Sequence, residues 1–182
     1  MRLKYLVMDF TVSLLSILYL WDLKRAREME NNDILRRLRY AFDFNDKQMI
    51  GLFEEGGVST DRAQVSNWLK RDDDPDFVEL KDVELAAYLN GLIVLKRGKK
   101  EGVTYQPEQK LNNNIILRKL RIALNFKDED MLGILRKVDF KLGKHELSAF
   151  FRKPEQAQYR LCKDQVLRNF LYGLEKQLRK KA

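Results

Sequence analysis

The sequence predicts an all-α protein, built as a tandem duplication of a four-helix unit that packs as a pseudo-twofold helical globule. The first supporting observation is an internal repeat at a fixed offset of 82 residues. The second is that apolar residues in each repeat follow helical spacing, while no segment keeps a strand-like alternation for long. The third is composition, because only 3 prolines and 9 glycines in 182 residues leave room for long helices.

The repeat holds without a gap between residues 31–94 and residues 113–176. Within these 64 positions, 19 residues are identical. A unit of this length buries a modest core and is marginal alone, so we expect the two copies to pack on each other. In first-copy numbering, the retained residues are Asn31, Asn32, Ile34, Leu35, Arg36, Leu38, Arg39, Ala41, Phe44, Asp46, Met49, Gly51, Ser66, Lys81, Asp82, Leu85, Leu89, Gly91 and Leu92.

Two helices are expected in the first half of each unit. Asn32 or Asp33 can cap the first helix, because their side-chain oxygens satisfy free backbone N–H groups. The second helix begins at Asp46 and ends at Gly56-Gly57, since glycine favours helix ends. The side chains expected to face the core are Ile34, Leu35, Leu38, Ala41 and Phe42 in the first helix, and Met49, Ile50, Leu52 and Phe53 in the second.

Two further helices are expected in the second half. The third begins at Asp61, with Gln64 three residues later as a partner of the capping-box type. Residues 72–75 (DDDP) break the chain, and the fourth helix runs from Lys81 to about Arg97. The expected buried side chains are Val65, Trp68 and Leu69 in the third helix, replaced in the second copy by Leu147, Phe150 and Phe151, and Leu85, Leu89 and Leu92 in the fourth.

The chain divides into an N-terminal extension (1–28), a first helical repeat (29–97), a linker (98–111) and a second helical repeat (112–182). The linker, GKKEGVTYQPEQKL, is polar and contains glycine and proline. In the extension, Tyr5–Trp21 is largely apolar with Asp9 as its one charged residue, which makes it a marginal membrane anchor. The alternative is an upstream mis-start with Met29 as the natural start. A membrane is an expected partner only if residues 1–28 are native.

The net charge of +8 belongs to the second repeat, because residues 112–182 carry +9 while residues 29–97 carry −4. A basic surface of this size attracts nucleic acid or an acidic partner. The alternative is attraction between the acidic and the basic copy, within one chain or head to tail between chains. We therefore expect a protein partner or self-association, with nucleic acid as the other open partner class.

Cationic side chains are the candidates for binding nucleic acid or an acidic partner. Arg36 and Arg39 recur in the second copy, and arginine offers a planar donor fork that suits phosphates. Their alternative role is ion pairing between helices or capping. Residues 57–71 resemble a helix-turn-helix, but the acids at 72–74 repel phosphates, which favours the second copy. The full candidate set is Arg36, Arg39, Arg118, Arg121, Lys141, Lys144, Arg152 and Lys153.

No motif for catalysis, cofactor or metal is present in the sequence. One cysteine and one histidine exclude a disulfide framework and a four-ligand Cys/His zinc site within the chain. Cys162 stands where the first copy has Leu80 and is expected to be a small buried hydrophobe, while His145 is expected on the surface. We expect no enzymatic activity and no cofactor, and the sequence identifies no small-molecule substrate.

The stretches NNDILRRLRYAF, SNWLKRDDDPDF, LNGLIVLKRGK and NNNIILRKLRIAL resemble the YehS family of uncharacterised bacterial proteins. The resemblance covers residues 29–182 and includes the duplication, the linker and the register. It implies a small cytoplasmic protein that begins just before the NDI motif, and it brings no known activity or site. The expected function is a non-enzymatic protein-interaction or regulatory module. The alternative is nucleic-acid binding through helix-turn-helix-like elements of the basic second repeat.

Overall fold

The computed structural model describes residues 29–99, 102 and 105–179, and all regular structure in them is helical. This confirms the predicted fold class. The two copies carry the same four helices in the same order. Those of the first copy are α2 (Asn31–Phe42), α3 (Asp46–Glu55), α4 (Arg62–Leu69) and α5 (Asp82–Arg97). Those of the second are α6 (Asn113–Leu124), α7 (Asp128–Arg136), α8 (Lys144–Phe150) and α9 (Asp164–Arg179).

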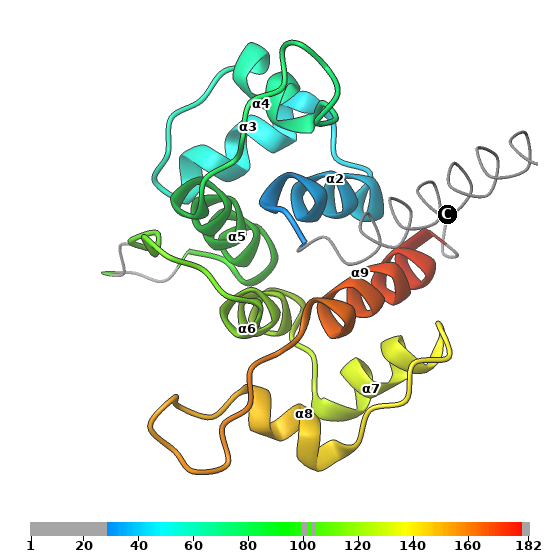
Figure 1. Cartoon of the computed structure of the whole chain (residues 1–182). Coiled ribbons are helices and arrows are strands. Elements are labelled where there is room, and N and C mark those ends of the chain that lie inside the picture. Colours follow the sequence, from blue (N-terminus) through cyan, green and yellow to red (C-terminus); the bar gives the residue numbers. More distant parts are fainter. Residues whose placement is uncertain (1–28, 100–101, 103–104, 180–182) are drawn as a thin grey trace, which may run out of the picture.

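The two copies interlock instead of packing as closed units. Helix α5 packs chiefly against α3 of its own copy and against α6 of the other copy, and α9 packs in the same way against α7 and α2 (Figure 1). The first and last helices of one copy touch each other only slightly. Exchanging the two copies leaves this pattern unchanged, as the pseudo-twofold arrangement requires. A single buried apolar cluster therefore draws residues from both copies.

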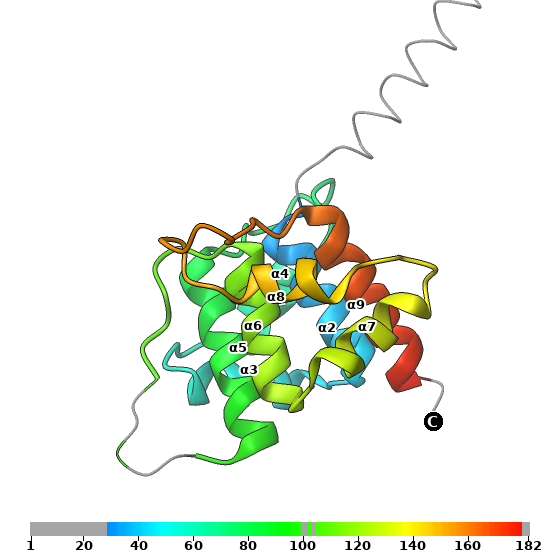
Figure 2. The same ribbon diagram turned by 90° about the horizontal axis from the view of Figure 1, so that it is seen from below.

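The paired helices α2–α9 and α5–α6 form the centre of the molecule. Helices α3 and α4 lie on one side of this centre and α7 and α8 on the other, as Figure 1 shows from top to bottom. The long loops that follow α4 and α8 run along the same side of the molecule, which is uppermost in Figure 2. Helices α2 and α9 begin on that side as well.

Helix boundaries follow local capping, with one correction to the sequence-based expectation. Asn45 caps α3 in a capping box with Gln48, and Asp61 caps α4 by accepting the backbone N–H of Gln64 at 2.7 Å. The expected cap of α2 at Asn32 or Asp33 is wrong, because the helix begins at Asn31 with Glu30 as N-cap residue. Asn32 is buried within the first turn and bonds to a different segment, as described below.

The N-terminal extension, with its apolar stretch Tyr5–Trp21, lies outside the described residues. Among the residues that are described, no helix has the length and apolar character needed to cross a membrane.

Glycine at one retained position allows the helices to approach closely. A Cβ added at Gly91 in α5 would lie 1.8 Å from the carbonyl oxygen of Leu52 in α3. At the equivalent Gly173 in α9, it would lie 2.3 Å from the carbonyl oxygen of Ile134 in α7. Real Cβ atoms do not approach backbone atoms so closely, so only glycine fits where these helices cross.

We expect Gly91→Ala and Gly173→Ala each to lower the free energy of unfolding by about 1–3 kcal/mol or more, because the crossing helices must separate. Chemical denaturation followed by circular dichroism measures the effect. The matched control is Gly51→Ala in α3, where an added Cβ meets nothing within 4 Å. An unchanged denaturation midpoint for Gly91→Ala would show that the helices do not pack as closely as described.

Candidate functional site

Two buried asparagines hold the long loops of the molecule. The Asn32 side-chain amide donates to the carbonyls of Trp68 and Val78 at 2.8 and 2.9 Å, and its oxygen accepts the N–H of Leu80 at 2.9 Å. Asn114 makes the equivalent bonds to Phe150, Arg160 and Cys162 at 2.9, 2.8 and 2.9 Å. Each asparagine thus satisfies one backbone carbonyl in the last turn of a helix and two backbone groups in the loop that follows it, which is a structural role.

Asp82 links the two copies at the backbone. Its Oδ1 accepts the side-chain amide of Asn31 at 2.8 Å, and its Oδ2 accepts the backbone N–H of Leu111 at 2.9 Å. Leu111 lies two residues before the first helix residue of the second copy. The carboxylate therefore connects the last helix of one copy to the start of the other.

Asp164 makes the equivalent link in the opposite direction. It accepts the amide of Asn113 at 2.5 Å and the backbone N–H of Met29 at 2.9 Å. Sequence reasoning considered Asp82 and Asp164 for ion pairing or capping and did not predict these links between the copies.

Arg36 in α2 and its equivalent Arg118 in α6 bind the C-terminal ends of α4 and α8. Arg36 Nη1 donates to the carbonyl of Lys70 at 2.5 Å, and Arg118 Nη2 donates to the carbonyl of Phe151 at 3.1 Å. These carbonyls follow the last turn of each helix and have no intrahelical partner, so the arginines act as caps.

The other retained arginine pair fastens the loop to the next helix. Arg39 donates through Nε to the carbonyl of Phe44 and through Nη2 to Asp46, at 3.2 and 2.8 Å. Arg121 repeats both contacts with Phe126 and Asp128, at 3.3 and 2.9 Å. Part of the hydrogen-bonding capacity of all four arginines is thus committed within the chain.

The candidate cations of the second copy surround α8. Lys141 lies in the preceding loop and Lys153 in the following one. Both are exposed, and neither side chain has a recorded partner in the part of the chain that the structure describes. Lys144 pairs with Glu129 at 3.1 Å, and Arg152 is half-buried. Lys141 and Lys153 thus lie next to the two ends of one helix.

A groove of about 620 Å³ runs along the outer face of α3 towards the start of α4. Ile50 and Gly51 line it together with charged side chains. Ile50, which was expected to face the core, does pack against the core cluster, but it is only half-buried and also lines this groove. The lining residues are Asn45, Asp46, Lys47, Ile50, Gly51, Glu54 and Arg62.

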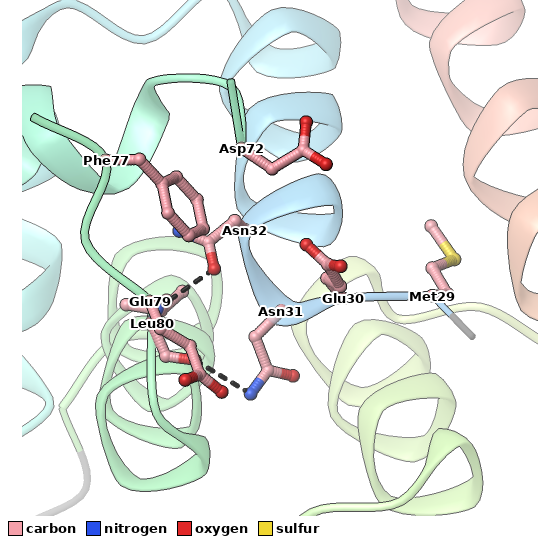
Figure 3. A pocket seen from close by; sticks show the side chains of 8 residues that line it. All are labelled: Met29, Glu30, Asn31, Asn32, Asp72, Phe77, Glu79 and Leu80. Carbon is pink, nitrogen blue, oxygen red and sulfur yellow. Dashed lines mark hydrogen bonds between the residues drawn. The ribbon is translucent and has the colours of Figure 1, made fainter. Parts of the chain in front are cut away.

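An acidic pocket of about 580 Å³ lies at the start of α2, beneath the loop that follows α4 (Figure 3). The carboxylates of Glu30, Asp72 and Glu79 surround it, together with the ring of Phe77. The equivalent positions of the second copy hold Asn112, Pro154 and Leu161, so the acidic character belongs to the first copy alone. The lining residues are Met29, Glu30, Asn31, Asn32, Asp72, Phe77, Glu79 and Leu80.

Cys162 and His145, the one cysteine and the one histidine of the chain, lie in different environments. Cys162 is buried, and its pKa is raised to about 12, first by burial and then by the nearby carboxylate of Asp164. His145 is exposed in the first turn of α8. In the described ranges, no group of three or more His, Cys, Asp or Glu side chains is arranged to hold a metal ion.

Comparison with known proteins places the chain in a family. The family model described as "Protein of unknown function (DUF1456)" matches twice, over residues 31–98 and 113–180. The uncharacterised protein YehS of Escherichia coli (strain K12) is 41% identical over 147 residues, which cover 80% of this chain and 94% of that protein. No solved structure matches. The chain belongs to the DUF1456 family, and the YehS resemblance inferred from the sequence is confirmed.

We expect Cys162 to resist thiol reagents while the protein is folded. Its raised pKa keeps the thiol protonated at pH 8, and burial blocks access, so both effects slow modification. Labelling with Ellman's reagent at pH 8 measures the rate, and the urea-unfolded chain is the reference for an accessible thiol. Complete labelling of the folded protein as fast as the unfolded chain would contradict this assignment.

Proposed function

We propose that this member of the DUF1456 family is a non-enzymatic protein-interaction module that binds its partner along the outer faces of α3 and α7. A single observation carries the proposal. Both copies have a glycine at the equivalent position in the interior of these helices, Gly51 in α3 and Gly133 in α7. Glycine within a helix costs about 0.5–1 kcal/mol relative to alanine.

No contact within the described chain explains these two glycines. An added Cβ at Gly51 meets nothing within 4 Å, and at Gly133 it meets only the flexible end of Arg136 at 3.8 Å. Gly91 and Gly173, in contrast, have a clear steric reason in the helix crossings. These glycines lower helix stability without a compensating contact inside the chain. This supports the view that a group outside the chain approaches the helix closely at these positions.

The surroundings of Gly51 suit a protein partner. The half-buried Ile50 offers apolar surface beside the glycine, and the charged side chains that also line the groove offer polar contacts. An apolar centre within a polar rim is the usual anatomy of a protein interface. In the second copy, Leu132 takes the position of Ile50 and is likewise half-buried beside Gly133.

The test separates binding from stability. We expect Gly51→Ala and Gly133→Ala each to raise the free energy of unfolding by about 0.5–1 kcal/mol, and the double variant to lose the partner. Proteins captured from cells by the wild-type chain are compared with those captured by the double variant. Gln177→Ala, at a half-buried polar position of α9 outside the proposed interface, is the control. Identical capture by a double variant of higher stability would refute the proposed interface.

We propose nucleic-acid binding as the second candidate function, because Lys141 and Lys153 lie exposed on either side of α8 without recorded side-chain partners in the described residues. Within the same residues, Arg179–Asp43 is the one recorded ion pair that joins the first copy to the second. The second copy carries a formal charge of +9, which supports attraction of phosphates.

For this second candidate, we expect duplex DNA or RNA to bind with an affinity that falls steeply with salt. Fluorescence anisotropy over a salt series measures it. Lys141→Glu/Lys153→Glu is the informative variant, because Arg118 and Arg121 hold helix ends and their loss would confuse binding with stability. Lys47→Glu/Lys99→Glu makes the same charge change in the first copy and its adjoining linker. No binding at low salt, or equal loss in both variants, would exclude a site around α8.

A further inference from the structure

We propose that a cavity between the two copies binds a small phosphate-bearing molecule through three arginines. The cavity, of about 340 Å³, lies where the C-terminal half of α2 and the loop after it meet the ends of α4 and α9. Arg36 and Arg39 come from the first copy, and Arg179 comes from the second. The full lining consists of Arg36, Arg39, Tyr40, Asp43, Phe44, Leu69 and Arg179. This site uses other elements than the groove along α3, so it goes beyond the proposed function.

The first two guanidinium groups are held in place but not fully used. Arg36 is bonded to the carbonyl of Lys70 and to Asp33, both at 2.5 Å. Arg39 is bonded to the carbonyl of Phe44 and to Asp46. A guanidinium has five N–H groups, and each of these arginines uses two of them in the hydrogen bonds just described. Donors of fixed position then remain for a ligand, which lowers the entropic cost of binding.

Arg179 is positioned by aromatic stacking. Its guanidinium carbon lies 3.3 Å from the centroid of the Tyr40 ring, and its Nε donates to the Tyr40 carbonyl at 3.0 Å. Its contact with Asp43 is long, at 3.4 Å, and the Asp43 side chain is 92% exposed. A carboxylate so weakly held is readily displaced, and its place is the natural position for a ligand oxyanion.

Size and donor geometry select the ligand class. The volume is at the lower end of the roughly 300–1,000 Å³ of small-molecule sites, which suits a compact ligand and not a polymer chain. Guanidinium forks match the oxygens of phosphate in pairs, and a phosphate has enough oxygens to satisfy more than one fork. A ligand held by arginines of both copies would also stabilise their packing, which is a means of regulation.

The second copy keeps arginine at the three equivalent positions, Arg118, Arg121 and Arg97, but changes the two residues that contact Arg179. Ile122 stands in place of Tyr40, and Asn125 stands in place of Asp43. Asp43 and Asn125 share the same left-handed backbone conformation, with φ of 55° and 54°. Asp43→Asn therefore introduces a residue that the fold already accommodates at the equivalent position, while it removes the carboxylate that competes for Arg179.

The test is calorimetric titration of the full chain with inorganic phosphate and pyrophosphate, at ionic strength held constant with chloride. We expect one site per chain for the wild type. Arg179→Gln should weaken binding about tenfold or more, since hydrogen bonds to charged groups are lost. Asp43→Asn should tighten it, because the competing carboxylate is gone. Lys176→Gln removes a positive charge from the same helix outside the cavity and should leave the affinity unchanged.

Two sets of outcomes overturn the proposal. One is the absence of a saturable 1:1 isotherm with either anion. The other is equal weakening by Arg179→Gln and Lys176→Gln, which would show attraction by net charge and not a defined site. Because Asp43→Asn preserves the fold and is expected to act in the opposite direction to Arg179→Gln, a loss of stability in the arginine variant does not obscure the result. An affinity unchanged by Asp43→Asn would also count against the site.

Discussion

A buried asparagine amide at the first turn of α2, and another at the first turn of α6, each bond to one carbonyl in the last turn of a helix and to two backbone groups of the long irregular loop that follows. Asn32 and Asn114 are 1% and 3% exposed. Unsatisfied buried amide groups cost about 1–3 kcal/mol each, so these loops can lie against the core only because the asparagines are there. The loops in turn place Asp82 and Asp164 at the start of the last helix of each copy, within reach of the other copy.

The interlocked packing follows from these contacts and from the helix crossings. Each last helix packs against the first helix of the other copy. The face of α2 that meets α9 and the face of α5 that meets α6 are therefore buried only when both copies are present. The retained arginines then fasten helix ends in both copies alike. Most of the identities between the copies thus serve the scaffold, and Gly51 and Gly133 stand out because their retention serves no contact inside it.

The repeat register and helical periodicity were enough to predict the fold class, the start of α3 at Asp46 and the cap at Asp61, because these depend on local sequence. The role of Asn32 was not predictable, since its partners lie 36 to 48 residues away. Nor was the arginine cavity, because Arg179 reaches Tyr40 only through the packing of α9 on α2. Residue identity shows which groups are present, whereas long-range packing decides which of them share a cavity.

Divergence between the copies separates two kinds of surface. The residues around the acidic pocket and the arginine cavity differ between the copies: Glu79 is replaced by Leu161, and Tyr40, which stacks on Arg179, is replaced by Ile122. The glycine positions on α3 and α7, by contrast, occur twice and are related by the pseudo-twofold arrangement. A contact face that occurs twice suits a partner with two equivalent elements. Once the first element is bound, the second is held at a high effective concentration near its own face, which strengthens the binding. Single pockets instead suit a ligand that binds once per chain, so duplication followed by divergence can supply a symmetric binding face and an asymmetric ligand site on one scaffold.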